Sequence, residues 1–146
     1  MIRVDVRPEP IDVAAELAAH DAGGHGASAS FIGRVRGDDG LVELFLDHHP
    51  VLTARGLDEL ATQAAARWRL GALTLIHRVG AMAPGDTIVL VLASSPHRAE
   101  ALAVTEYLID RLKTDVMLWK RETFADGRAA WVEQREGDHA RAERWD

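Results

Sequence analysis

"DTIVLVLASSPHRAEALAVTEYLIDRLK", residues 86–113, joins the most apolar run of the chain to its most regular helical pattern. Because residues 86–95 are apolar almost throughout, they predict a central β-strand that is covered on both faces. Residues 95–113 predict a long helix, with Ser95 as its cap and Pro96 in its first turn. The predicted buried stripe of this helix consists of Leu102, Thr105, Leu108, Ile109 and Leu112. This strand and helix form the expected centre of the fold.

The rest of the chain supplies further strand-like runs and two helical ones. The strand-like runs are residues 2–6, 28–36, 41–49, 72–80, 116–124 and 129–136, and the helical ones lie within residues 8–26 and 50–70. The resulting order, β-α-β-β-α-β-β-α-β-β, predicts an α+β fold with a mostly antiparallel sheet and packed helices. We expect a single domain over residues 1–146, in which residues 136–146 form a charged tail.

Short loops predict which strands pair. Residues 28–36 and 41–49 are separated only by "GDDG" and predict an antiparallel hairpin. A Pro-Gly turn joins residues 72–80 to the central strand, and "ADGR" joins the last two strands into a second hairpin.

Composition and charge exclude several classes of function. The net charge of −6 argues against general binding of nucleic acid or of an anionic membrane. The chain has no cysteine, so it has no disulfide and no thiolate nucleophile. We see no signal-peptide pattern and no apolar stretch near the ~20 residues of a membrane helix, and therefore expect a cytoplasmic protein.

Lysine is scarce in this chain and occurs at two neighbouring places. Lys113 and Lys120 are its only lysines, both within "LKTDVMLWKRE", whereas arginine occurs 15 times. Lys120 follows Leu118 and Trp119 in a predicted strand, so we expect its stem to be partly desolvated, which lowers a lysine pKa and suits proton transfer. The alternative is a lysine that extends from a sheet edge, with Lys113 a plain cation near a helix C-terminus.

Other basic residues fall at the ends of predicted elements. Arg36 ends a strand, while His97 and Arg98 begin the long helix, where free N–H groups favour an anion such as phosphate. The alternative is an ordinary helix start with solvated His97 and Arg98. His48 and His49 point to opposite faces of a strand, so we predict no metal site, and no motif indicates a cofactor.

The ordered motifs of residues 28–136 resemble the large, catalytic subunit of molybdopterin synthase. The matching stretches are "FIGRVRGDDG", "LFLDHHP", "ARWRLGALTLIHRVGAMAPGD", "VLASSPHRAEALAVTEYLIDRLKT", "LWKRE" and "WVEQRE". The resemblance implies an α/β-hammerhead fold and a sulfurtransferase that acts in molybdenum cofactor biosynthesis. The chain departs from the family at His49, where we expect a tyrosine.

The resemblance also implies partners and a substrate. Two large subunits would form the central homodimer of a heterotetramer, and each would bind a small ubiquitin-like sulfur carrier with a C-terminal Gly-Gly thiocarboxylate. The substrate would be cyclic pyranopterin monophosphate (precursor Z), which gains two sulfurs to become molybdopterin.

Site residues follow from the resemblance position by position. Lys113 and Lys120 match the catalytic lysines, which also bind substrate. Arg36 matches a pocket arginine, and His97 and Arg98 match phosphate-binding residues expected to come from the neighbouring large subunit. Arg135 matches a further basic position of the substrate site.

The sequence leaves two other interpretations open. The first is a non-catalytic α+β dimer that keeps the anion pocket and the carrier groove as a scaffold; a disabled relative of that kind should have lost a lysine or the "PHR" step, and this chain keeps both. The second is an unrelated domain that binds a phosphate ligand, for which the ordered set of motifs would have to be a coincidence.

Overall fold

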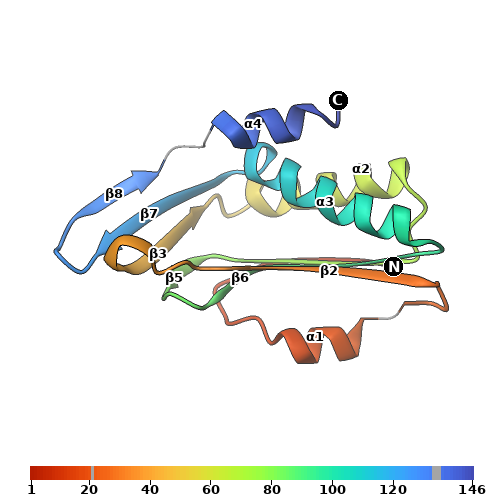
Figure 1. Ribbon diagram of the computed structural model, residues 1–146, viewed down its shortest axis with the longest axis horizontal. Helices are drawn as coiled ribbons and strands as arrows, with labels where there is room; N and C mark the ends of the chain where they lie inside the picture. Colours follow the sequence, from red (N-terminus) through yellow and green to blue (C-terminus); the bar gives the residue numbers. More distant parts are fainter. Residues whose placement is uncertain (21, 133–135) are drawn as a thin grey trace.

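Two four-stranded β-sheets, covered by helices, make up the fold in the computed structural model, which describes residues 1–20, 22–132 and 136–146 (Figure 1). The strand order of the first sheet is β1-β4-β6-β2, from Ile2–Arg7, Ala72–Arg78, Thr87–Ser95 and Ala27–Arg34. β1 pairs with β4 in parallel, and β6 pairs antiparallel with β4 and β2. The predicted α+β class with mostly antiparallel pairing is confirmed.

The second sheet projects from one end of the first (Figure 1). Its strand order is β5-β3-β7-β8, from Gly80–Met82, Leu41–His48, Leu118–Phe124 and Ala129–Val132. All its pairs are antiparallel, including the predicted hairpin of β7 and β8. Alternate side chains of its strands point to opposite faces, and Leu44 and Leu46 of β3 are buried on one of them.

Helices cover both faces of the first sheet (Figure 1). α1, Val13–Ala19, lies on one face, and α2, Leu52–Arg67, and α3, Arg98–Asp115, lie on the other. The main hydrophobic core fills the space between α2, α3 and the sheet, and the first sheet contributes Leu73, Leu75, Val89, Val91 and Ala93 to it. The predicted role of β6 as a central strand is therefore confirmed, because β4 and β2 flank it and its side chains are buried from Val89 to Ser95.

The predicted hairpin of residues 28–36 and 41–49 is wrong. β2 pairs with β6 in the first sheet, whereas β3 pairs with β5 and β7 in the second. Val35 explains the separation, because its N–H donates to the Asp86 carbonyl (2.9 Å) and its carbonyl accepts from the Gly85 N–H (2.8 Å). The chain is held to the turn before β6, and a short 3₁₀ helix, Asp38–Gly40, then leads it into the other sheet.

Two details of the predicted α3 helix are also wrong. Ser95 does not cap it, because Ser95 is the buried last residue of β6 and His97 occupies the N-cap position without a side-chain cap. Leu102 is not part of the buried stripe, since 60% of its surface is exposed. An apolar side chain of this size on the outer side of α3 is available for contact with another molecule.

The predicted charged tail forms a packed helix, α4, Glu136–Glu143. The buried carboxylate of Asp110 on α3 accepts hydrogen bonds from Arg141 (3.1 Å), Arg144 (2.8 Å) and the Trp145 ring N–H (2.8 Å). Trp145 also packs edge-on against Trp68, with ring centroids 5.7 Å apart. The charges of this segment therefore attach it to α3.

Candidate active site

Three of the predicted site residues belong to the same end of the molecule. α3 follows β6 and packs back against both β6 and β2. Because β2 is antiparallel to β6, α3 runs in the same direction as β2, and Lys113 in its last turn lies toward the end of β2 near Arg34. Arg36 follows two residues later; its side chain is 74% exposed and only 3.9 Å from the Asp38 carboxylate.

Lys120 reaches the same region from the second sheet. It stands on β7 opposite Leu46 of β3 and Val132 of β8. Leu118, two residues earlier and on the same face of the strand, packs against the main core. Lys120 therefore extends from the edge of that core. Lys120 as a whole residue is exposed in the single chain.

Lys113 also extends from the main core. Ile109 lies one helical turn earlier on the same side of α3 and packs against the core. Lys113 borders an open groove of about 520 Å³ that is lined by side chains of α3, β2 and α4, among them Phe31 and Leu102. The two lysines thus reach one end of the core from different elements.

A buried histidine that the sequence analysis did not assign to the site lies near the end of β4. His77 on β4 is 4% exposed, and its Nδ1 lies 2.9 Å from the Arg78 carbonyl oxygen. Burial, together with the positive charges of Lys120 and Lys113, lowers the pKa of His77 to about 4. The ring is therefore neutral at pH 7 and lies within the electrostatic field of both lysines.

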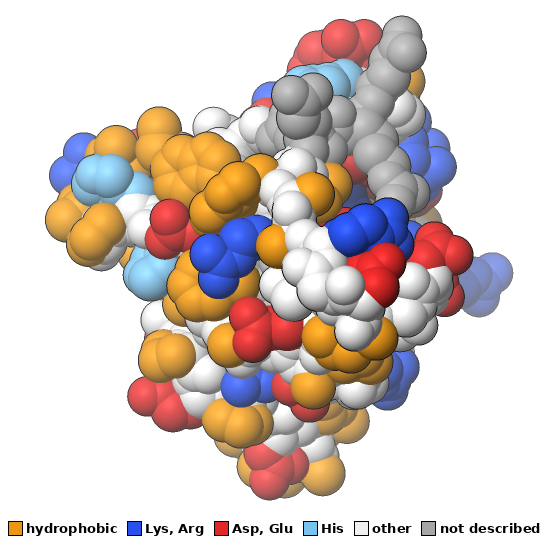
Figure 2. Space-filling view, turned by 90° about the vertical axis from the view of Figure 1, so that its left-hand side faces the viewer, with side chains coloured by type: hydrophobic (Ala, Val, Ile, Leu, Met, Phe, Trp, Pro, Cys, Tyr) orange, Lys and Arg blue, Asp and Glu red, His pale blue; other side chains and the backbone are white. Residues whose placement is uncertain are grey.

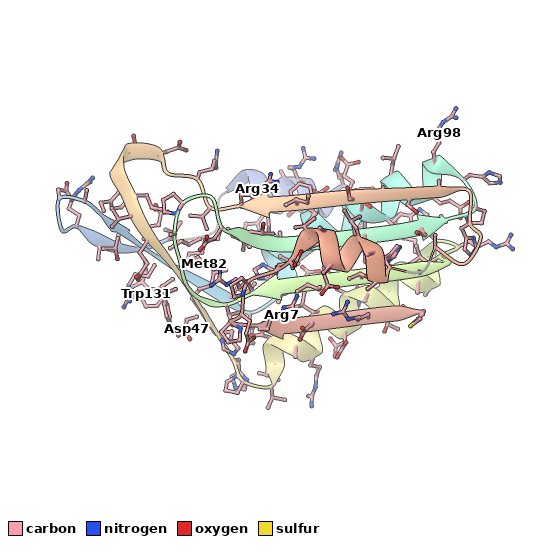
Figure 3. All side chains as sticks on the ribbon, turned by 90° about the horizontal axis from the view of Figure 1, so that it is seen from below. Arg7, Arg34, Asp47, Met82, Arg98 and Trp131 are labelled. Atoms are coloured by element: carbon pink, nitrogen blue, oxygen red, sulfur yellow. The ribbon has the colours of Figure 1, made fainter. Side chains whose placement is uncertain are left out.

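The second basic pair lies at the far end of α3. Arg98 is its first residue and His97 its N-cap, and the fifteen-residue separation from Lys113 corresponds to about 22 Å along the helix. Figure 3 shows Arg98 at the opposite end of the molecule from Met82 and Trp131. A single chain therefore does not bring Arg98 to the lysines. Arg135 lies outside the described residues.

The outer face of the second sheet carries an aromatic and basic cluster. Figure 2 views this end of the molecule and shows hydrophobic side chains beside basic and acidic ones. Phe45, Arg121 and Trp131 stand in one row across three strands, and the Arg121 guanidinium lies 5.2 Å and 5.6 Å from the two ring centroids. About half of the surface of Trp119 and of Trp131 is exposed. Sequence patterns alone did not predict this row because it depends on strand register.

His49, where the resemblance led us to expect tyrosine, contacts the start of α2. Its Nδ1 accepts hydrogen bonds from the backbone N–H groups of Val51 (3.1 Å) and Leu52 (3.0 Å). The backbone N–H of His49 in turn donates to the Thr53 hydroxyl (2.9 Å). This departure from the expected residue therefore has a local structural role in holding the first turn of the helix.

The fold is α+β, and the end of the molecule that carries Lys113 and Lys120 is suited to bind an anionic ligand. Comparison with known proteins identifies the family. Residues 6–115 match the family model described as MoaE protein. The molybdopterin synthase catalytic subunit of Salmonella typhimurium is 42% identical over 149 residues, which cover 98% of this chain and 97% of the relative. The chain belongs to the MoaE family of molybdopterin synthase catalytic subunits, which act in molybdenum cofactor biosynthesis.

Solved structures agree with this assignment. The molybdopterin biosynthesis MoaE protein of Burkholderia ambifaria superposes with a TM-score of 0.84 at 37% identity, covering 99% of this chain and 98% of the other. The same fold occurs, with a TM-score of 0.74 at 21% identity over 92% and 91% of the two chains, in the complex of subunits 1 and 2 of molybdopterin-converting factor from Helicobacter pylori. No helix among the described residues is long and apolar enough to cross a membrane.

Proposed function

We propose that this chain transfers sulfur from the C-terminal thiocarboxylate of a small ubiquitin-like carrier to cyclic pyranopterin monophosphate. The observation that carries the proposal is the arrival of Lys113 and Lys120 at one end of the core from two separate elements, with Arg36 at the same end. Both the carrier terminus and the substrate are anionic, and lysine and arginine side chains stabilise such groups by charge-assisted hydrogen bonds. Family membership supports the same reaction.

The reaction requires no nucleophile from this chain, in agreement with its lack of cysteine. The thiocarboxylate sulfur forms a bond to an oxygen-bearing side-chain carbon of the pterin. The carbon–oxygen bond at that carbon breaks as its oxygen takes up a proton and leaves, and the carrier stays attached as a thioester. Water then cleaves the acyl–sulfur bond, so the carrier departs as a carboxylate and the sulfur stays on the pterin. Lys113 stabilises the charge that develops on the acyl oxygen, and Lys120 moves a proton and holds the substrate. A second charged carrier repeats the cycle.

A second copy of the chain completes this site in our proposal. Among the described residues, no strand pairs with the outer edge of β2, and the adjacent groove exposes Phe31 and Leu102. Antiparallel pairing of β2 with its copy about a two-fold axis would set the two α3 helices side by side in opposite directions. The His97 and Arg98 end of one α3 would then face the Lys113 end of the other, where the pair can bind the substrate phosphate.

One carrier would bind each chain at the end that carries Lys113 and Lys120. Two large and two small subunits would then form a heterotetramer. The Helicobacter pylori relative was solved as a complex of its two subunits, which supports a partner of this kind. The exposed side chains of Trp119 on β7 and Trp131 on β8 offer apolar surface at the same end of the molecule.

The test combines the purified chain, a thiocarboxylated carrier and cyclic pyranopterin monophosphate, and measures molybdopterin. We expect product with the wild-type chain and a loss of at least ~100-fold with Lys113→Ala, because charge stabilisation at the reacting acyl group is removed. Arg128→Ala, an exposed cation in the turn between β7 and β8, is the control and should leave the rate unchanged. Equal rates for wild type and Lys113→Ala would show that the catalytic role is wrong.

A further inference from the structure

Arg36 depends on its backbone for its position. Its side chain is 74% exposed, and its guanidinium lies 3.9 Å from the Asp38 carboxylate, which is itself 73% exposed. An ion pair between two groups so exposed is weak and does not fix a long side chain in one direction. The direction in which Arg36 extends is therefore set mainly by the backbone of residues 35–37.

The first sheet releases the chain just before this point. The register between β2 and β6 shifts between Gly33 and Arg34, where β2 ends. An irregularity of this kind interrupts regular pairing and re-aims the residues beside it. Arg36 follows two residues later, so contacts outside the ladder of β2 and β6 have to hold its backbone.

The turn between β5 and β6, residues 83–86, holds this backbone on both sides of Arg36. On one side, Val35 is only 5% exposed and makes two backbone hydrogen bonds to the turn, of 2.8 Å and 2.9 Å. On the other side, Gly37 lies so close to the turn that a Cβ atom added to it would be 3.2 Å from the Cβ of Pro84. Both neighbours of Arg36 are thus fitted to one turn.

The carboxylate of Asp86 closes this turn. Its Oδ2 accepts a hydrogen bond from the Ala83 N–H (2.9 Å), and the Asp86 N–H donates to the Ala83 carbonyl (3.1 Å). The same Oδ2 accepts from Nη1 of Arg78 on β4 (3.3 Å). The Arg78 side chain is 12% exposed, and its Nε donates to the Pro8 carbonyl (2.8 Å). Printed side-chain contacts therefore tie the turn to the first sheet.

We propose that Asp86, held by Arg78, is a positioning residue for Arg36: it fixes the turn against which residues 35–37 pack and so sets where the Arg36 guanidinium meets its ligand. This role rests on the proposed function, in which Arg36 binds an anionic group at the end of the molecule that carries the lysines. Small displacements of a group that orients a substrate cost much of the rate.

Amide hydrogen exchange, followed by NMR, tests the structural part without any reaction. Asp86 is 39% exposed, so its replacement should leave the fold intact. We expect the Val35 N–H to exchange at least ~10-fold faster in Asp86→Ala, because the turn opens more often. Asp86→Asn, whose side-chain oxygen can still accept from the Ala83 N–H, should stay within about threefold of the wild type.

Asp126 supplies a matched control for this measurement. In the turn between β7 and β8, its carboxylate also accepts from a backbone N–H and a guanidinium, both of Arg128 (3.0 Å and 2.7 Å). Asp126→Ala should leave the exchange of the Val35 N–H unchanged. An exchange rate of Val35 that Asp86→Ala does not alter either would overturn the proposal.

A double-mutant cycle on molybdopterin formation separates the positioning of Arg36 from a general effect on the fold. We expect Asp86→Ala to lower kcat/KM by ~10-fold or more in the wild type, but by less than about twofold in the Arg36→Ala background, where nothing remains to be positioned. Asp86→Asn should again stay within about threefold of the wild type. Equal losses in both backgrounds would contradict the positioning role.

Arg78→Lys is a second route to the same turn, in case Asp86→Ala does not fold. Lysine keeps the cation but lacks the planar fork that donates to Pro8 and Asp86 together, so the same cycle with Arg36→Ala should give a loss in the same direction. If the wild-type chain forms no molybdopterin, the proposed function fails, and the exchange of Val35 alone then decides whether Asp86 holds the backbone beside Arg36.

Discussion

Lys113 and Arg98 occupy opposite ends of one helix, α3, about 22 Å apart along its axis. The resemblance to the family predicts that both residues belong to the substrate site, yet one chain does not join them. The two-fold pair of chains that we propose would resolve this, because each α3 would contribute its last turn to one site and its first turn to the other.

Mixing two inactive variants tests this arrangement. Arg98→Ala keeps Lys113, and Lys113→Ala keeps Arg98, so a mixed pair contains one complete site and one site that lacks both residues. If subunits reassort randomly, half of the pairs are mixed and we expect about one quarter of the wild-type activity to return. Activity is measured after joint unfolding and refolding of the two chains. A mixture no more active than its components would show that the two residues serve one site within one chain.

Leu102→Glu tests the surface that joins the two copies. The side chain is 60% exposed in the single chain and borders the groove beside β2, so a charge there should block association without a large loss of folded structure. We expect a monomer in sedimentation equilibrium and a loss of molybdopterin formation. Leu17→Glu, on exposed α1, is the control and should leave the mass unchanged. A dimer that survives Leu102→Glu would place the contact elsewhere.

Lys120→Arg separates charge from proton transfer. The substitution keeps a cation but removes an amine that can give up a proton, so a general acid or base role predicts a loss of roughly 100-fold or more in turnover. The rate is measured under saturating substrate and carrier. Unchanged turnover would limit Lys120 to electrostatic binding, and Arg128→Lys provides the conservative control in the neighbouring turn.

Asp110→Asn tests the attachment of α4. Burial raises the pKa of Asp110, but hydrogen bonds from Trp145, Arg144 and Arg141 outweigh it and lower the pKa below its usual value. Because the folded pKa is below the unfolded one, this carboxylate contributes stability above the unfolded pKa of about 3.9 and loses it as the pH falls through the folded pKa. We expect the substitution to lower the free energy of unfolding by about 1–3 kcal/mol at neutral pH.

The acid range provides the second part of that test. The difference in unfolding free energy between wild type and Asp110→Asn, measured by urea denaturation, should shrink as the pH falls from about 5. Glu59→Gln, on the exposed side of α2, is the control and should leave neutral-pH stability unchanged. A difference that stays constant with pH would mean that the ionised form of Asp110 is not what holds α4.

His49→Ala should weaken the start of α2. The ring nitrogen accepts from two N–H groups of the first turn, and loss of such a cap costs about 1 kcal/mol. Thermal unfolding measures the effect, and His49→Asn should recover part of it because its side-chain oxygen is also an acceptor. His48→Ala, one position earlier in β3, is the control.

Sequence patterns predict those elements whose signal is local. β6 is apolar almost throughout and α3 follows it with a clear helical period, and the structure confirms both elements. The pairing of residues 28–36 is not predictable in this way, because the hydrogen bonds of Val35 go to Gly85 and Asp86, fifty residues further along the chain. A short polar loop between two strands predicts a hairpin turn, whether the strands pair with each other or lie in different sheets.

The sequence likewise predicts individual residues of the candidate site but not how the fold arranges them. Lys113 and Lys120 stand out by their scarcity, but only the fold shows that Arg98 is remote from them. His77 has no sequence signal beyond a histidine in an apolar run, which is usually a core residue. The helical packing of α4 is not predictable from its own residues, because Asp110, which binds its arginines, lies in a different segment.

A helix that carries a basic group at each end also fixes their relative rotation. Successive residues of an α-helix differ by about 100° around the axis. Inserting one alanine in the middle of α3 would turn the Lys113 end against the Arg98 end by that angle, although no site residue would change. In the two-fold pair that we propose, both reaction centres would lose their alignment together, which would make the length of α3 in residues a requirement of the site.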